Sequence, residues 1–279
     1  MGLRAQPGGD DVEYRQLGNT GQQVPEIGLG TWKYKGSPDA LLKGIELGAN
    51  LIDTAEMYRN ESSVGEAVKG NREKVLIATK VSGSHLDYDS VLKAAENSLR
   101  QLDDSIIDLY QIHWPNKNVP IFETLRAMET LVDRGMVRYI GVSNFSVSEL
   151  REAMLGMNKY PIVSNQVLYN LKKRDIERDL IPFCVDNNVT VIAYTPLADG
   201  SLAGRSRFLP DIGGAVLEGI AEEVGKTPAQ VALNWCLSRP NMIVIPKSSN
   251  VTRTVENCEA SGWSLSHDQV ARLDEAYSD

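Results

Sequence analysis

The feature that most constrains the fold is a regular alternation of two kinds of segment along the chain. Short apolar runs rich in β-branched residues recur, each too short for a helix and bounded by glycine, proline or polar residues, as buried parallel strands are. With the segment at 28–32, the expected strands are 28–32, 50–53, 75–80, 107–113, 137–143, 163–166, 190–194 and 242–246. So many strand–helix units favour a closed barrel over an open, doubly wound sheet.

Segments of helical period lie between these strands. They include 91–102, 122–132, 176–185 and 229–237, and the last follows Thr227 and Pro228, which suit a cap and a first-turn proline. A hairpin is expected at 14–27 around Gly18–Gly21, and a final amphipathic helix at 266–277. The prediction is a (β/α)8 TIM barrel with an N-terminal β-hairpin and a C-terminal accessory helix.

Composition narrows the class of protein. The chain has 279 residues, 42% of them hydrophobic, which suits one catalytic domain over residues 12–279. We expect residues 1–11, which are rich in glycine, to be a disordered arm. A net charge of −8 argues against nucleic-acid or membrane partners. Three scattered cysteines and no signal-like or membrane-spanning segment favour a cytoplasmic protein, monomeric or weakly homo-oligomeric.

Polar side chains gather where the expected strands end. In a barrel these ends meet at one rim, where catalytic groups come together. Taken singly, each residue has an ordinary structural explanation, as a helix cap or a solvated loop residue. Two opposite charges and an imidazole on neighbouring strands are harder to explain that way. The strand-end residues are Asp53, Lys80, His113, Ser143 with Asn144, Gln166 and Tyr194.

The ordered motifs of the chain resemble those of the aldo-keto reductases. They are Asp53-Thr-Ala-Glu-Met-Tyr58-Arg-Asn60-Glu61, Ala78-Thr-Lys80, Ile112-His113-Trp114-Pro115, Gly141-Val-Ser143-Asn144-Phe145 and Ile245-Pro246-Lys247-Ser248. A single motif is of moderate specificity, whereas the ordered set is highly specific. The resemblance implies NADPH-dependent reduction of aldehydes and ketones, with Asp53, Tyr58, Lys80 and His113 as the catalytic tetrad.

The chemistry of that reaction gives each of the four a role. Tyrosine can protonate the developing alkoxide if its pKa falls from about 10 towards neutrality. An ammonium about 4 Å away contributes about 4 kcal/mol at an effective dielectric of 20, so Lys80 is expected to lower the pKa of Tyr58. Asp53 would keep the buried Lys80 charged, and His113 would donate a hydrogen bond to the carbonyl oxygen.

The same resemblance places the cofactor across the rim. The segment from Gly28 to Lys33 lacks the third glycine of a Rossmann fingerprint. The resemblance implies that Lys247, Ser248 and Arg253 meet the 2′-phosphate, so NADPH is preferred over NADH. The remaining implied contacts are Thr31, Trp32 and Asp53; Ser143, Asn144 and Gln166 at the nicotinamide carboxamide; Tyr194 under the ring; Thr195, Pro196, Leu197 and the loop 198–207 at the pyrophosphate; and Glu256 and Asn257 at adenine.

The substrate is expected to be a small-molecule carbonyl compound. Trp32, Met57 and Trp114 match positions that line the family's pocket, together with Tyr58 and His113. The segment 116–120 is short and the given chain ends soon after residue 277, so we expect an open mouth and broad specificity for small aldehydes. The loop 198–211 or a partner subunit could instead close it.

Two other functions remain open from the sequence. One is a class I aldolase-type barrel in which Lys80 forms a Schiff base. The other is an NADPH-binding regulatory module with little turnover. No metal is expected, because His85, His113 and His267 have no zinc-site spacing.

Overall fold

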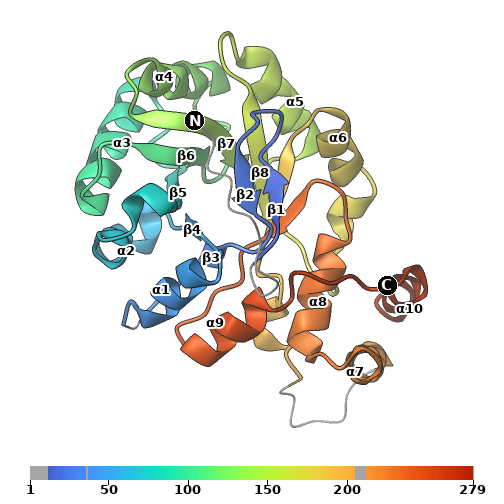
Figure 1. Cartoon of the computed structure of the whole chain (residues 1–279). Coiled ribbons are helices and arrows are strands. Elements are labelled where there is room, and N and C mark those ends of the chain that lie inside the picture. The colour runs from blue at the N-terminus through green and yellow to red at the C-terminus, as the bar shows by residue number, and fades with distance from the viewer. Residues whose placement is uncertain (1–11, 36, 205–211, 279) are drawn as a thin grey trace.

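The computed structural model describes residues 12–35, 37–204 and 212–278, so the predicted arm at 1–11 lies outside the described part of the chain. At the centre, eight parallel strands follow one another around a ring (Figure 1). They are β3 (Leu29–Gly30), β4 (Leu51–Asp53), β5 (Leu76–Val81), β6 (Ile107–Ile112), β7 (Val137–Ser143), β8 (Ile162–Leu168), β9 (Thr190–Tyr194) and β10 (Met242–Val244).

The ring closes between its first and last strands. Parallel bridges join Ile27 to Val244 and Gly30 to Lys247. The backbone nitrogen of Gly28 donates to the carbonyl oxygen of Val244 at 2.8 Å. The predicted (β/α)8 barrel is therefore confirmed. Each strand of the ring begins and ends within two residues of its predicted position.

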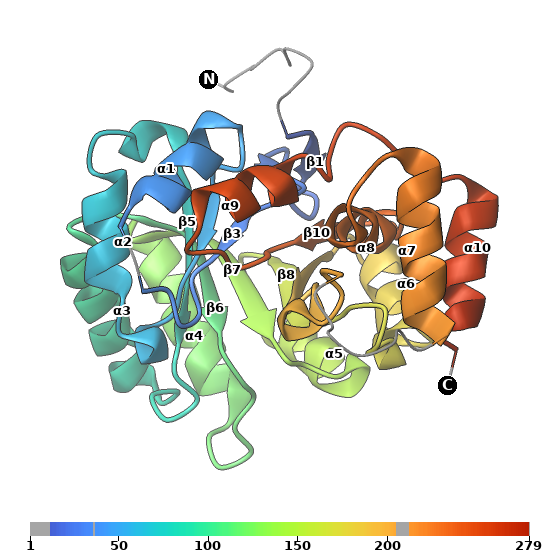
Figure 2. The ribbon, with the colours of Figure 1, turned by 90° about the horizontal axis from the view of Figure 1, so that it is seen from below.

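Helices cover the outside of the barrel (Figures 1 and 2). Those between successive strands are α1 (Asp39–Glu46), α2 (Glu61–Val68), α3 (Tyr88–Leu102), α4 (Ile121–Asp133), α5 (Val147–Gly156), α6 (Leu180–Asp186) and α8 (Pro228–Leu237), and α9 (Val251–Cys258) follows β10. Short 3-10 turns are η1 (Glu56–Tyr58), η2 (Arg72–Lys74), η3 (Asp175–Glu177) and η4 (Ala198–Gly200). No helix among the described residues is long and apolar enough to cross a membrane.

Two helices lie side by side at the edge of the barrel. They are α7 (Ile212–Val224) and the expected C-terminal helix α10 (His267–Ala276), seen together in Figure 2. Arg272 of α10 pairs with Glu223 of α7 at 2.7 Å. The predicted helix at 176–185 is instead broken into η3 and α6. Pro182 has no N–H to donate, which suits the first turn of a helix better than its interior.

The N-terminal hairpin closes one end of the barrel. Its strands β1 (Tyr14–Gln16) and β2 (Gln23–Pro25) are antiparallel and cross the centre of the ring in Figure 1. Leu17 and Val24 pack against side chains from the barrel interior: Leu51, Ala78, Leu109, Val163, Ile192, Ile243 and Ile245. The opposite end, where the strands finish, is left open for polar side chains.

Side-chain alternation along the strands explains this division. Successive side chains of a strand point to opposite faces, so residues two apart share a face. Leu51 is in the apolar interior cluster, and Asp53 lies two residues further on the same strand. Ala78 and Leu109 precede Lys80 and Gln111 in the same way. The apolar layer thus supports a polar layer at the open end.

Two helical glycines provide a matched test of helix packing. A methyl group at Gly65 of α2 would collide with the carbonyl oxygen of Leu102 in α3, whereas one at Gly219 of α7 meets nothing within 4 Å. Alanine stabilises an unobstructed helix by about 0.5–1 kcal/mol relative to glycine. We expect Gly219→Ala to raise the free energy of unfolding by that amount, and Gly65→Ala to lower it by about 1–3 kcal/mol, in urea unfolding. Equal effects of the two substitutions would contradict the close contact between α2 and α3.

Candidate active site

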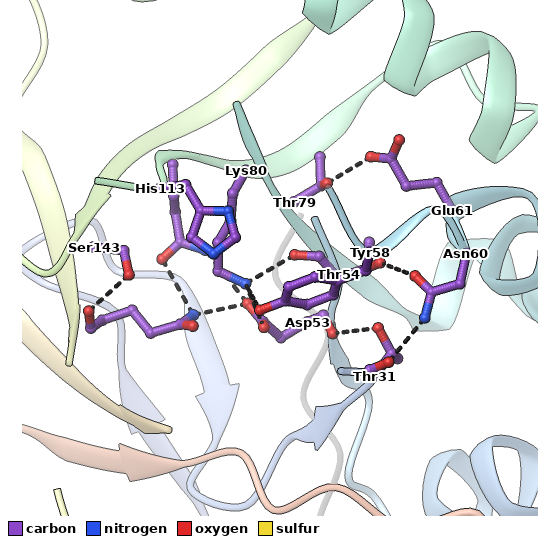
Figure 3. A network of polar contacts seen from close by, with 12 residues as sticks. Thr31, Asp53, Thr54, Tyr58, Asn60, Glu61, Thr79, Lys80, His113 and Ser143 are labelled. Atoms are coloured by element: carbon purple, nitrogen blue, oxygen red, sulfur yellow. Dashed lines mark hydrogen bonds and ion pairs between the residues drawn. The ribbon is translucent and has the colours of Figure 1, made fainter. Parts of the chain in front are cut away.

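A buried ion pair joins the ends of two neighbouring strands. The Nζ atom of Lys80, on β5, lies 2.6 Å from Oδ1 of Asp53 at the end of β4. It also donates to the carbonyl oxygen of Thr54 at 2.9 Å and contacts the hydroxyl of Tyr58 at 3.4 Å (Figure 3). Lys80 is fully buried and Asp53 is nearly so. Three of the four predicted catalytic residues therefore form one connected chain.

The turn that carries Tyr58 is fixed by a neighbouring amide. The side chain of Asn60 donates to the carbonyl oxygen of Thr31 at 2.8 Å and accepts from the hydroxyl of Thr54 at 2.8 Å. Arg59 has a left-handed backbone with φ of 56°, which turns the chain from η1 into α2. Asn60 is buried and outside the predicted site. Its only sequence signal is its place two residues after Tyr58 in the quoted motif.

Burial and Asp53 act in opposite directions on Lys80. Burial lowers the pKa of Lys80, and the Asp53 carboxylate opposes this effect. The second oxygen of Asp53, Oδ2, accepts from Nε2 of Gln166 at 2.8 Å and from Nε2 of Gln111 at 3.4 Å. These amides provide hydrogen bonds to the carboxylate oxygen of Asp53 that does not bind Lys80. Asp53 can thus remain a counter-ion inside the barrel.

The expectation that Lys80 lowers the pKa of Tyr58 is wrong for this structure. Burial raises the pKa of Tyr58 above its ordinary value, and the carboxylate of Asp53 adds to that rise. Burial is the main cause, and Lys80, which is 2.6 Å from Asp53 and 3.4 Å from the Tyr58 hydroxyl, does not reverse the rise. Tyr58 therefore holds its proton throughout the ordinary pH range.

His113, the fourth predicted residue, follows directly after β6. Burial is the main cause that lowers the pKa of His113 to about 3, and the charge of Lys80 adds to it. Its ring stacks on Trp114 with centroids 3.9 Å apart and lies edge-on to Tyr58 at 5.6 Å. Its buried Nδ1 atom has no hydrogen-bond partner among the described residues. His113 is therefore a neutral imidazole beside the tyrosine hydroxyl.

A cavity of about 530 Å³ opens at this end of the barrel. Lys80 does not line the cavity, because it is buried beneath Tyr58, where it bonds Asp53 and the Tyr58 hydroxyl. Ser248 also does not line it, since its hydroxyl donates to the carbonyl oxygen of Asn250 at 2.9 Å, just before α9. All the other predicted site residues line the cavity: Thr31, Trp32, Asp53, Met57, Tyr58, His113, Trp114, Ser143, Asn144, Gln166, Tyr194, Thr195, Pro196, Leu197, Lys247, Arg253, Glu256 and Asn257.

One wall of the cavity is a preorganised set of amides and hydroxyls. Asn144 has a left-handed backbone with φ of 63°, and its side chain donates to the carbonyl oxygen of His113 at 3.0 Å. Its Oδ1 atom accepts from the hydroxyl of Tyr194 at 3.0 Å. The hydroxyl of Ser143 donates to the carbonyl oxygen of Gln166 at 2.9 Å. These contacts fix the side chains of Ser143, Asn144 and Tyr194 against one another and against the backbone of the neighbouring strands.

The far part of the cavity carries a basic pair. Lys247 follows β10 and Arg253 lies in the first turn of α9, and neither forms an ion pair with any described residue. Burial lowers the pKa of Lys247, and the charge of Arg253 adds to the effect. Two cations beside a helix start suit an anionic ligand in an otherwise acidic protein.

The mouth of the cavity exposes large apolar side chains. Trp32, Met57 and Trp114 are 47%, 43% and 42% exposed. Five further lining residues are absent from the predicted site: Gly30, Lys33, Ala229, Ile245 and Pro246. Of the loop expected at the pyrophosphate, residues 205–207 lie outside the described part. No cluster of three histidine, cysteine, aspartate or glutamate side chains suited to a metal occurs among the residues that the structure describes.

Comparison with known proteins agrees with the geometry. The model of the aldo/keto reductase family matches residues 26–278. The methylglyoxal reductase YeaE of Escherichia coli is 38% identical over 266 residues, covering 91% of each chain. The glyoxal reductase of Bacillus subtilis is 34% identical over 262 residues, covering 92% of this chain and 90% of that protein.

Solved structures give the same result. A thermostable aldo-keto reductase in complex with the inhibitor epalrestat is 41% identical, with a TM-score of 0.87 over 95% of this chain and 99% of the other. An aldo-keto reductase from Klebsiella pneumoniae in complex with NADPH is 36% identical, with a TM-score of 0.86 over 95% of each chain. The fold, the ordered strand-end residues and these matches lead to one conclusion: this chain belongs to the aldo/keto reductase family.

Proposed function

We propose that this protein reduces aldehydes and ketones to alcohols with NADPH, and that Tyr58 is the proton donor. The observation that carries this proposal is a series of hydrogen bonds from Asp53 to Lys80 and from Lys80 to the hydroxyl of Tyr58. Tyr58 lines the cavity beside the neutral His113. An acid at that place can protonate a carbonyl oxygen at the moment negative charge develops on it.

The proton moves from the Tyr58 hydroxyl to the oxygen of the substrate. NADPH, when bound, supplies the hydride that adds to the carbonyl carbon, so the product is a neutral alcohol. An alkoxide is a stronger base than a phenolate, so Tyr58 can donate even though its pKa is raised. Lys80, 3.4 Å away, then stabilises the phenolate, and Asp53 maintains the charge of Lys80.

His113 orients the substrate. With a pKa lowered to about 3, it is neutral at physiological pH and does not compete with Tyr58 as an acid. Its ring is fixed between Trp114 and Tyr58. We propose that one ring N–H donates a hydrogen bond to the carbonyl oxygen, which polarises the carbonyl and directs the oxygen towards the Tyr58 hydroxyl.

The residues of the cavity fit NADPH. The basic pair Lys247 and Arg253, which lacks acidic partners among the described residues, provides a site for the 2′-phosphate. The wall of Ser143, Asn144 and Gln166 offers both donors and acceptors for a carboxamide. We propose that the remaining cofactor contacts are Thr31, Trp32, Asp53, Tyr194, Thr195, Pro196, Leu197, Glu256 and Asn257, all of which line the same cavity.

Small aldehydes are the proposed substrates. Trp32, Met57 and Trp114 offer apolar surface at the mouth, and their exposure of more than 40% leaves room for side groups of different size. Two relatives are named for methylglyoxal and glyoxal, which are small dicarbonyl compounds. We therefore include 2-oxoaldehydes among the substrates and expect broad specificity.

Schiff-base chemistry at Lys80 has less support. Its ammonium group is fully buried, does not line the cavity, and is held by Asp53 and Thr54. An imine would need a substrate carbonyl to displace Tyr58 and the lysine to lose its proton beside a carboxylate. A regulatory NADPH-binding module would use the same cavity, and its distinguishing property would be negligible turnover.

Removing the Tyr58 hydroxyl tests the proposed acid. We expect Tyr58→Phe to lower kcat for aldehyde reduction by about 1,000-fold or more, while the Kd for NADPH stays within about twofold, because only the proton donor is lost. Lys80→Met should be comparably harmful and Asp53→Asn milder. Turnover is measured by NADPH absorbance, with Tyr160→Phe, a partly buried tyrosine that does not line the cavity, as a matched control. Retention of most of the rate in Tyr58→Phe would exclude Tyr58 as the acid.

The basic pair predicts a preference for NADPH over NADH. One charge-assisted contact contributes about 1.5–3 kcal/mol, so two should give a preference of about 100-fold or more. We expect Arg253→Ala to reduce this ratio at least about tenfold, by weakening NADPH alone, in a fluorescence titration. Arg178→Ala, at an 87% exposed side chain, is the matched control. Equal affinities of the wild type for the two cofactors would contradict this assignment.

A further inference from the structure

We propose that Glu56 is a positioning residue that sets the distance between the Tyr58 hydroxyl and the Lys80 ammonium. This inference rests on the proposed function, in which Tyr58 donates the proton. Glu56 is the first residue of η1, and Tyr58 is the last. The side chain of Glu56 does not line the cavity, and its hydrogen-bond partners are Ser82 and His85 rather than Lys80 or Tyr58, so its effect is exerted through the backbone.

The Glu56 carboxylate connects the two elements that carry the proton-transfer pair. Its Oε2 atom accepts from the backbone N–H of Ser82 at 2.8 Å. Ser82 follows the last residue of β5 and lies two residues after Lys80. One hydrogen bond to a carboxylate therefore ties the turn with Tyr58 to the strand with Lys80, close to both residues.

A histidine holds the other oxygen of the carboxylate. Nδ1 of His85 lies 2.7 Å from Oε1 of Glu56. The backbone N–H of His85 donates to the carbonyl oxygen of Ser82 at 2.9 Å, so His85 and Ser82 belong to one tight turn. Both oxygens of Glu56 thus bind the loop that follows β5. A carboxylate held at both oxygens has one orientation, which makes the connection stiff.

The turn is also anchored on its other side. Asn60 binds Thr31 and Thr54, at the ends of β3 and β4, at 2.8 Å each. Tyr58 therefore lies midway between two anchors, one to β5 and one to β3 and β4. The Tyr58 hydroxyl lies 3.4 Å from Nζ of Lys80, which is the longest of the three hydrogen bonds of that ammonium group. A small further displacement of Tyr58 would break this hydrogen bond. Proton donors need placement within a fraction of an ångström, so loss of the β5 anchor should misplace Tyr58.

The test compares three substitutions at Glu56. Glu56→Ala removes the anchor, Glu56→Gln keeps an oxygen that can accept from Ser82, and Glu56→Asp shortens the side chain by one carbon, about 1.5 Å. Glu66→Ala, on the exposed face of α2, is the control. For each protein we measure kcat and KM for an aldehyde, the Kd for NADPH, the melting temperature, and the solvent deuterium isotope effect on kcat.

We expect Glu56→Ala to lower kcat about tenfold or more, with the Kd for NADPH within about twofold. Its solvent isotope effect should exceed that of the wild type, because proton transfer becomes slower. Glu56→Asp should show the same two changes to a smaller degree, and Glu56→Gln should recover most of kcat. If Glu56→Ala does not fold, Glu56→Asp and Glu56→Gln still test the inference.

Two results would overturn the inference. One is an unchanged kcat and isotope effect in Glu56→Ala, or in Glu56→Asp when the alanine variant does not fold. The other is a lower melting temperature with kcat unchanged, which would show a role in stability alone. A wild-type protein that binds NADPH but has no turnover would instead contradict the proposed function.

Discussion

The site depends on one buried ion pair, between Lys80 and Asp53. An ammonium group without water nearby keeps its proton only if a carboxylate compensates for the lost hydration. The barrel provides this by pairing β4 with β5, so that Asp53 and Lys80 lie on adjacent strands and face the same interior. The amides of Gln166 and Gln111 complete the carboxylate's hydrogen bonds. Without this pair, neither a charged Lys80 nor a stabilised phenolate on Tyr58 would be available.

The same ion pair explains the titration behaviour of its neighbours. The charge of Lys80 helps to keep His113 neutral, while the charge of Asp53 helps to keep Tyr58 protonated. Tyr58 and His113, which both line the cavity, are therefore both neutral. This arrangement suits an uncharged carbonyl group, whose oxygen becomes negative only during hydride addition. Lys80 contacts the Tyr58 hydroxyl from the buried side. In the proposed mechanism its positive charge acts only after Tyr58 has lost its proton, when it stabilises the phenolate.

Much of this arrangement is visible in the sequence, because strand ends of a parallel barrel meet at one rim. Asp53, Lys80 and His113 each end an apolar run, so their convergence follows from the fold. The contacts of Asn60, Gln111 and Glu56 are not visible in this way, since their partners are backbone groups and side chains that only folding brings close. The rise in the pKa of Tyr58 is not visible in the sequence either, because it depends first on how deeply folding buries the hydroxyl and then on the nearby Asp53 carboxylate. Ser248 matches the motif, yet its hydroxyl binds the backbone before α9 and lies outside the cavity.

In the proposed function, the site transfers a hydride and a proton to a carbonyl group. This transfer is tested most directly with NADPH that carries deuterium at its hydride-donating carbon and with a small aldehyde such as methylglyoxal. We expect an alcohol with one deuterium on the former carbonyl carbon, formed in many turnovers per protein. Absence of the deuterated alcohol, together with a borohydride-trapped adduct on Lys80, would contradict it and indicate Schiff-base chemistry.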